Sequence, residues 1–230
     1  MFLFILHLPV LAQQGVTTFG LQVKPVVPLE FFDPLTAVSR DRLSGSIELT
    51  GGLAYGMLIR HGITKSISLE TGINQIRRRY DLRITNDTSG YDGTGKLRWI
   101  GYEVPVTGLV FIRLGERSYM NTALGFSVDM YPSNAVVDIE EGRLFLFRNN
   151  WVQLGVVGNI GLEYRTEKSG IFYLGATYHR PFGPMSTADL TYYGPDFFPY
   201  TLRTDLSGSY LTVDLRYFFH EDPDRTRLRN

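Results

Sequence analysis

Apolar side chains alternate with small or polar ones along many segments of this chain. In SIELTGGLAYGMLIR, residues 46–60, aliphatic and aromatic side chains hold most odd positions, and glycine, serine, threonine and glutamate hold most even positions. The same alternation returns around Leu69, Leu124 and Val156. A period of two residues is typical of a β-strand, because successive side chains point to opposite faces of the sheet. The pattern predicts an all-β protein whose strands have one apolar face and one face of small and polar residues.

The segments and their connections predict a topology. The predicted strands are 16–27, 44–60, 65–85, 97–114, 119–131, 151–165, 171–181 and 207–220. Short turns at 61–64, 115–118 and 166–170 alternate with long connections at 28–43, 86–96, 132–150 and 182–206. Long strands with short turns on one side and long loops on the other are typical of outer-membrane barrels. We therefore predict an eight-stranded antiparallel up-and-down transmembrane β-barrel with both termini on the periplasmic side.

A soluble barrel of the lipocalin type is the main alternative, and its apolar face would point inward. Glycines are frequent on the polar face, as expected where small residues relieve crowding inside a narrow barrel. They are Gly20, Gly52, Gly56, Gly72, Gly101, Gly125, Gly155, Gly161 and Gly175. Aromatic side chains near the strand ends resemble the two interfacial belts of a membrane barrel. Tyr102 and Tyr178 lie on the loop side, Tyr164, Phe172, Tyr217 and Phe219 lie on the turn side, and the parity of Trp99 and Trp151 directs them inward. We expect the apolar face to meet lipid.

The N-terminal residues 2–12, FLFILHLPVLA, form an apolar run as long as a signal-peptide core. The run is too short for a membrane helix, which needs roughly 20 residues. We predict a signal peptide at 1–12, a barrel domain at 13–220 and a charged periplasmic tail at 221–230. A basic segment before the run is missing, and a buried N-terminal strand is the alternative reading. The predicted location is the outer membrane of a Gram-negative bacterium.

Charge and cysteine content exclude several classes. Lysine plus arginine equals aspartate plus glutamate, 23 against 23, which argues against a nucleic-acid partner. The chain has no cysteine, which excludes disulfides and thiolate metal sites.

Several charged residues have the parity of the enclosed face. We place Lys24, Glu48, Arg78, Glu103 and Asp129 near the external half, and Glu70, Arg113, Glu163, Arg165, Asp214 and Arg216 near the periplasmic half. Because an eight-stranded barrel is just wide enough for its own side chains, we expect these charges to pair with one another. A proton or ion pathway is the functional alternative.

Catalytic and cofactor motifs are weak. Some outer-membrane barrels modify lipid A with histidine, serine and a carboxylate at the external edge, and only His179 lies at that height. Ser127 and Asp129 are its conceivable partners, but a plain strand-end histidine is the simpler interpretation. GTGK at 93–96 is a turn sequence rather than a phosphate-binding loop. We predict no enzyme activity, no catalytic residues, no cofactor and no metal.

The long connections hold the candidate binding residues. The segment 188–205 concentrates aromatic side chains in a polar frame, a composition favoured at binding surfaces. They are Tyr192, Tyr193, Phe197, Phe198 and Tyr200. The alternative is that these rings cover the barrel mouth or lie among lipopolysaccharide headgroups.

Three short motifs add a family resemblance. FGLQVKPVVP at 19–28, YEVPV at 102–106 and LTVDLRYFF at 211–219 resemble the PorT-like outer-membrane β-barrel proteins of Bacteroidota. The resemblance covers essentially the whole mature chain, although this chain ends on EDPDRTRLRN rather than on an aromatic residue. It implies a structural or accessory subunit of a secretion or assembly complex, acting through its extracellular loops, with outer-membrane lipid and other envelope proteins as partners. A lipid A-modifying enzyme and a small passive porin are the alternatives.

Overall fold

The computed structural model describes residues 15–29, 34–194 and 198–220. The predicted signal peptide at 1–12, the tail at 221–230 and the side chain of Phe197 lie outside these ranges. The regular elements within them are strands, and no helix there is long and apolar enough to cross a membrane. The strands are β1 Thr17–Val27, β2 Leu35–Arg40, β3 Leu43–Gly62, β4 Ile67–Asn86, β5 Tyr91–Arg113, β6 Ser118–Met130, β7 Ala135–Ile139, β8 Gly142–Arg148, β9 Val152–Arg165, β10 Ile171–Pro181, β11 Ser186–Tyr193, β12 Pro199–Leu206 and β13 Tyr210–Phe218.

The strands form two antiparallel sheets. The larger one has nine strands in the order β1-β13-β10-β9-β6-β5-β4-β3-β2, and β1 also pairs with β3. This additional ladder closes the sheet on itself and leaves β2 outside the closed part, which we call the ring. The smaller sheet has four strands in the order β12-β11-β8-β7. The all-β, antiparallel prediction is therefore confirmed.

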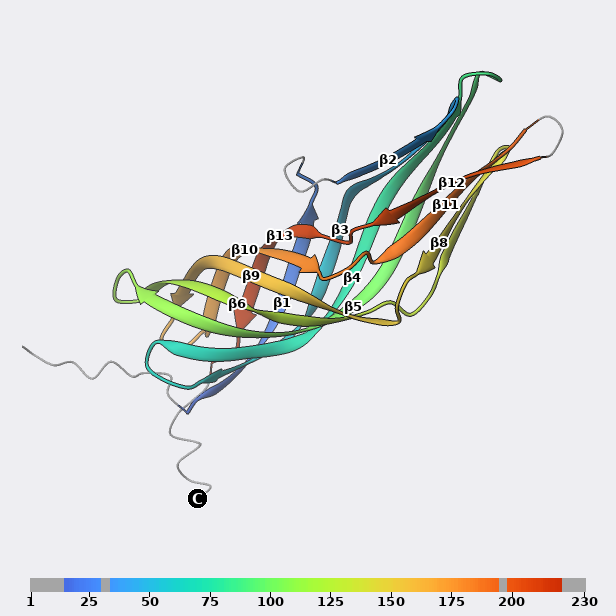
Figure 1. Ribbon diagram of the computed structural model, residues 1–230. Coiled ribbons are helices and arrows are strands. Elements are labelled where there is room, and N and C mark those ends of the chain that lie inside the picture. The colour runs from blue at the N-terminus through green and yellow to red at the C-terminus, as the bar shows by residue number, and fades with distance from the viewer. Residues whose placement is uncertain (1–14, 30–33, 195–197, 221–230) are drawn as a thin grey trace, which may run out of the picture.

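Strands β3, β4 and β5 are much longer than the others, with 20, 20 and 23 residues. Beyond the ring, their tip halves face the smaller sheet, and β2 lies along the edge of β3 (Figure 1). Contacts of β12 with β2 and of β5 with β7 join the two layers at both edges. We call this second part the extension.

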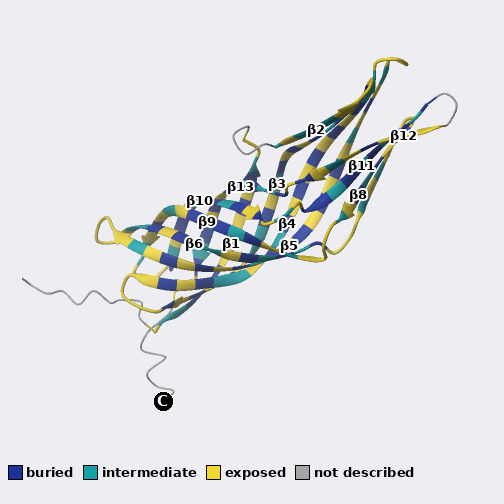
Figure 2. Cartoon of the chain, in the orientation of Figure 1, coloured by how far each residue is buried: buried dark blue, intermediate teal, exposed yellow. Residues whose placement is uncertain are grey.

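The two faces of β4 exchange their chemistry along the strand. Its buried residues, from the ring to the tip, are Ser68, Glu70, Asn74, Ile76, Arg78, Tyr80, Leu82 and Ile84. Its exposed residues change in the opposite sense, from the apolar Ile67, Leu69 and Ile73 in the ring to the charged Arg77, Arg79, Asp81 and Arg83 toward the tip. Apart from the half-buried pair Thr71 and Gly72, the buried residues are even-numbered along the whole strand (Figure 2). The ring is therefore polar inside and apolar outside, whereas the extension is apolar inside and charged outside.

A β-bulge makes the same exchange on β3. The register with β4 shifts between Leu49 and Gly51, and Gly51 has a φ of 141°, which glycine adopts most readily. On the tip side of the bulge, Ile47 and Leu49 are buried and Glu48 is exposed. The prediction that Glu48 points inward, with Leu49 facing outward, is therefore wrong. The prediction assumes that odd-numbered residues face outward along the whole of β3, but the bulge at Gly51 reverses the two sides.

The eight predicted segments coincide closely with β1, β3, β4, β5, β6, β9, β10 and β13, although β5 begins at Tyr91 rather than at 97. The described part of the chain has thirteen strands because β2, β7, β8, β11 and β12 lie in the predicted long connections. These five are shorter and pack one face on the apolar core of the extension. Their alternation of apolar and polar residues is therefore brief, and the sequence pattern predicts loops there instead of strands.

Candidate functional site

A continuous chain of ion pairs fills the ring interior near the short turns. In order, the chain joins Arg165, Glu163, Arg60, Glu70, Arg216 and Asp214. Its nitrogen–oxygen distances are 2.7, 2.6, 3.0, 2.6 and 2.6 Å in that sequence. Cations and anions alternate, so the chain has no net charge. Each carboxylate contacts at least one guanidinium, which offsets much of the cost of burial.

Packing around these ion pairs leaves little free space. The Arg60 guanidinium lies 3.9 Å from the Phe218 ring centre, and the Arg216 guanidinium lies 4.6 Å from that of Tyr173. A Cβ at Gly161 or Gly175 would overlap the Tyr173 hydroxyl, so glycine at these two positions makes room for the ring. The cavity beside the ion pairs has a volume of about 20 Å³, room for about one water molecule.

A second polar cluster lies higher in the ring, around His179. Its Nε2 atom is 2.9 Å from Ser127 Oγ, 2.9 Å from an Asp129 carboxylate oxygen and 3.7 Å from Glu103 Oε2. Glu103 accepts hydrogen bonds from Asn74 and from the Tyr210 hydroxyl. These side chains are almost fully buried.

In this cluster, the carboxylate contacts a different imidazole nitrogen from the one that it contacts in a catalytic triad. In a triad, the carboxylate holds Nδ1 of the imidazole and leaves Nε2 for the nucleophile. Here Nε2 faces both Ser127 and Asp129, and Nδ1 of His179 has no hydrogen-bond partner in the described residues. A substrate would also have to enter the filled interior. The arrangement fits a structural hydrogen-bond network better than a nucleophile.

Glu103, Asp129 and His179 could also hold a metal ion, since their ligand atoms lie within 4.8 Å of one another. Lys24 lines the same small cavity as Glu103, and the Arg78 guanidinium lies 4.9 Å from the ring centre of Tyr210, which contacts Glu103. Two cations therefore lie close to this group of carboxylates. This disfavours a further positive ion at the cluster.

Aromatic rings and an apolar core cover the end of the ring next to the extension. Trp99 and Tyr131 lie with ring centres 5.5 Å apart, and both are buried. Above them, the interior of the extension is lined by aliphatic side chains, among them Leu82, Leu144 and Leu190. The polar interior of the ring therefore meets a packed apolar core and not a water-filled mouth.

The structure places most predicted interior charges inside the ring. Lys24, Glu70, Arg78, Glu103, Asp129, Glu163, Asp214 and Arg216 are buried, and Arg165 is half-buried. Glu48 and Arg113 are exposed, so their predicted inward placement is wrong. Arg113 has inward parity, but it is the last residue of β5 and donates to the Gly115 carbonyl in the turn.

Arg60 is the central residue that sequence reasoning missed. It is 1% exposed and joins Glu70 to Glu163. The even parity of Gly52 and Gly56 continues to Arg60, so the signal was present in the sequence.

The predicted loop aromatics separate into two groups. Tyr192 is buried and packs 4.5 Å from Tyr91, and Tyr193 is half-buried, so these two belong largely to the extension's structure. Phe198 and Tyr200 are 70% and 56% exposed. Tyr200 lines a pocket of about 810 Å³ at the tips of the hairpins, opposite Arg40 and Arg42.

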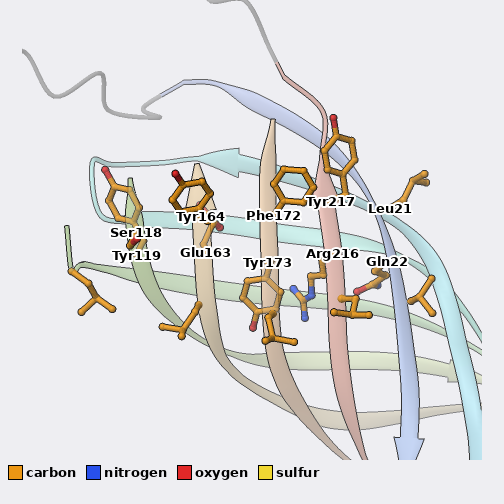
Figure 3. A pocket seen from close by; sticks show the side chains of 15 residues that line it. Leu21, Gln22, Ser118, Tyr119, Glu163, Tyr164, Phe172, Tyr173, Arg216 and Tyr217 are labelled. Atoms are coloured by element: carbon orange, nitrogen blue, oxygen red, sulfur yellow. The ribbon is translucent and has the colours of Figure 1, made fainter. Parts of the chain in front are cut away.

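The outer face of the ring has an apolar hollow of about 790 Å³ near the short turns. Figure 3 shows the rings of Tyr164, Phe172 and Tyr217 in a row on neighbouring strands beside it. Leu174 and Leu215 complete its apolar wall. Trp151, predicted to point inward, is 61% exposed at the opposite end of β9, so that prediction is wrong.

The outside of the extension carries paired charges. Arg83 Nε donates to Asp92 Oδ1 over 2.7 Å, and this bond holds the pKa of the Asp92 carboxyl below its usual range. Arg143 pairs with Asp138, and Arg203 pairs with Asp189. Burial raises the pKa of Tyr91 at the joint between β5 and β7.

Comparison with known proteins identifies the fold. No protein-family model and no curated protein sequence matches the chain. Among solved structures, the outer membrane protein OprG from Pseudomonas aeruginosa is similar, with a TM-score of 0.55 and 11% sequence identity over 91% of this chain and 100% of that chain. The chain therefore has the fold of an outer-membrane β-barrel protein. The narrower assignment to PorT-like proteins of Bacteroidota is not supported by these comparisons.

Proposed function

We propose that this protein is a non-conducting, non-catalytic outer-membrane barrel that holds a rigid extension at the cell surface. The ring of eight strands, the nine of the large sheet without β2, would cross the membrane. Both termini would then lie in the periplasm, and the extension would lie outside. The apolar outer face of the ring and its row of aromatic side chains support this placement.

The filled interior is the observation that carries the proposal. Ion pairs and aromatic side chains occupy the interior of the ring, and the apolar core of the extension lies across its outer end. A hydrated solute would have to break both. This favours a structural or accessory role over the passive porin.

Conductance in a planar lipid bilayer tests this role. The purified protein is expected to insert without discrete current steps, while a known porin from the same preparation gives them. Discrete current steps from the unchanged protein, which become larger when Glu163 and Arg60 are both replaced by alanine, would contradict the proposal.

A lipid-modifying activity is the competing function, because Ser127 and His179 are in contact. We propose that this contact is structural. His179→Asn is therefore expected to leave the mass spectrum of lipid A in expressing cells unchanged. A modification that the unchanged protein produces and the variant does not would establish the enzyme instead.

We further propose that the accessory role is exerted through the exposed aromatics of the β11–β12 hairpin. Purification from native membranes in mild detergent is expected to recover an envelope protein together with this one. The double variant Phe198→Ser, Tyr200→Ser is expected to lose this envelope protein. Val136→Ser, on the exposed face of β7, serves as the control. Recovery of the protein alone from native membranes contradicts this role.

A further inference from the structure

Three arginines form a row on the outer face where the apolar surface of the ring ends. Arg77 and Arg79 lie two residues apart on β4, so their side chains share one face. Arg98 is the direct cross-strand partner of Arg79 on β5. All three are exposed. We call these residues the arginine row.

The row marks the boundary between two surfaces. Arg77 is the member nearest the ring, and its direct cross-strand partners, Leu53 and Ile100, are exposed apolar residues. One row further toward the ring, Tyr55, Gln75 and Tyr102 are cross-strand neighbours, and the Tyr55 hydroxyl accepts a hydrogen bond from Arg77. If the ring crosses a membrane, tyrosines at this height mark the level of the lipid headgroups.

Two members of the row have no hydrogen-bond or ion-pair partner among the described residues. Like charges directly opposite each other in a sheet are destabilising. Arg79 and Arg98 are in this relation, and within the described ranges neither guanidinium has a hydrogen bond or an ion pair. Glu48, Asp81 and Lys96 form the next cross-strand row toward the tips, but neither carboxylate is within ion-pair distance of an arginine of the row. Other exposed arginines of the extension, such as Arg83 and Arg203, are paired with aspartates.

We propose that the arginine row binds the phosphate groups of a membrane lipid in the leaflet next to the extension. Guanidinium groups bind phosphate through parallel N–H···O bonds and stay charged at any physiological pH. A phosphate between Arg79 and Arg98 would replace their mutual repulsion with two attractive contacts. Glu48 and Asp81 would repel a phosphate from the tip side, which directs the site toward the membrane. The proposal rests on the proposed function, because it takes the ring to be the membrane-spanning part.

Lipid retention in native mass spectrometry tests the proposal. The probe is diphosphorylated lipid A, added to the folded protein in dodecyl maltoside micelles. The unchanged protein is expected to retain it, and Arg79→Gln, Arg98→Gln is expected to weaken retention by about tenfold or more, roughly the effect of losing one good charged contact. Arg79→Lys, Arg98→Lys keeps the charge without the fork and is expected to fall in between.

Matched controls separate the site from general charge. Arg83→Gln, Arg117→Gln removes two exposed arginines that are paired elsewhere, and it is expected to retain lipid A as the unchanged protein does. Phosphatidylcholine is expected to be retained less, because its phosphate is accompanied by a positive group. Equal retention by the glutamine variant of the row, or an equal loss in the control, would overturn the proposal.

Inorganic phosphate distinguishes the lipid from a free ion. It is expected not to displace lipid A at equal concentration, and displacement would assign the row to free phosphate. Insertion into lipid vesicles is measured separately for each variant. A protein that binds lipid A in micelles but never inserts would contradict the proposed function and leave the arginine–phosphate contact standing, whereas insertion without lipid A retention would contradict the contact alone.

Discussion

The ring and the extension share strands β3, β4 and β5 but obey opposite rules of burial. In the ring, an ion pair such as Arg60–Glu163 is buried and Leu124 is 68% exposed. In the extension, Leu144 is fully buried, and Arg83 and Asp92 form an exposed pair. Aliphatic side chains are most stable where water is excluded, so the exchange of faces along one strand is what a passage from lipid to water would require. If the ring crosses a membrane, as we propose, the change of face locates the boundary of that membrane.

The largest effect is expected from breaking the ion-pair chain of the ring. Glu163→Ala leaves Arg60 without one of its two carboxylates, and removing one partner of a buried pair costs about 3–5 kcal/mol. Urea unfolding in lipid vesicles, followed by tryptophan fluorescence, measures the loss. Glu167→Ala removes the exposed partner of Arg117 and is expected to change little. Equal losses in both variants would show that the interior of the ring is hydrated.

The next effect is expected in the core of the extension. Leu144→Ala removes a fully buried side chain there and is expected to cost about 2–5 kcal/mol. Limited proteolysis should then cut β7, β8, β11 and β12 while the ring stays protected. Val136→Ala, on the exposed face of β7, is the control. If cleavage of Leu144→Ala spreads to the ring strands, the two parts unfold as one unit.

The outer faces of the two parts should respond differently to the same charge. Leu124→Arg places a guanidinium in the middle of β6 on the apolar face and is expected to cost roughly 2–4 kcal/mol in a bilayer. Ser44→Arg places it on the exposed face of the extension, where its cross-strand partners Ser39 and Thr85 carry no charge, and is expected to be nearly neutral. Folding yield into vesicles at increasing urea compares them. Similar yields for the two variants would mean that Leu124 does not face lipid.

The smallest effect is expected at the Arg83–Asp92 pair. Asp92 has a lowered pKa in the folded protein, so its contribution is present above the ordinary aspartate range and is lost as pH falls through the folded pKa. Asp92→Asn should therefore lower the stability of the extension slightly at pH 7 and differ less from the unchanged protein at pH 2. Hydrogen exchange of β4 and β5 amides at the two pH values measures the difference. A larger effect at pH 2 than at pH 7 would have the wrong sign.

Period-two patterns were enough to predict the ring strands and most of their inward charges. The strands of the extension escaped because β2 and β7 are short, with six and five residues, and alternate only briefly. Glu48 was misplaced because the bulge at Gly51 breaks parity, and one glycine among many gives no local sign of that role. Ser127 and Asp129 were the conceivable partners of His179, and the structure brings both into contact with its Nε2 atom. Parity directs these side chains inward, but it cannot by itself decide which residues of the non-adjacent strands β6 and β10 meet.

Oxygen and nickel-chelate accessibility of spin labels along the outer face of β4 tests the central claim most directly. The chain has no cysteine, so single cysteines at Leu69, Ile73, Arg79 and Arg83 can each carry one label. In lipid vesicles, labels at Leu69 and Ile73 should be accessible to oxygen from the bilayer, and labels at Arg79 and Arg83 to the nickel chelate in water. Uniform accessibility to the chelate at all four positions would contradict the account.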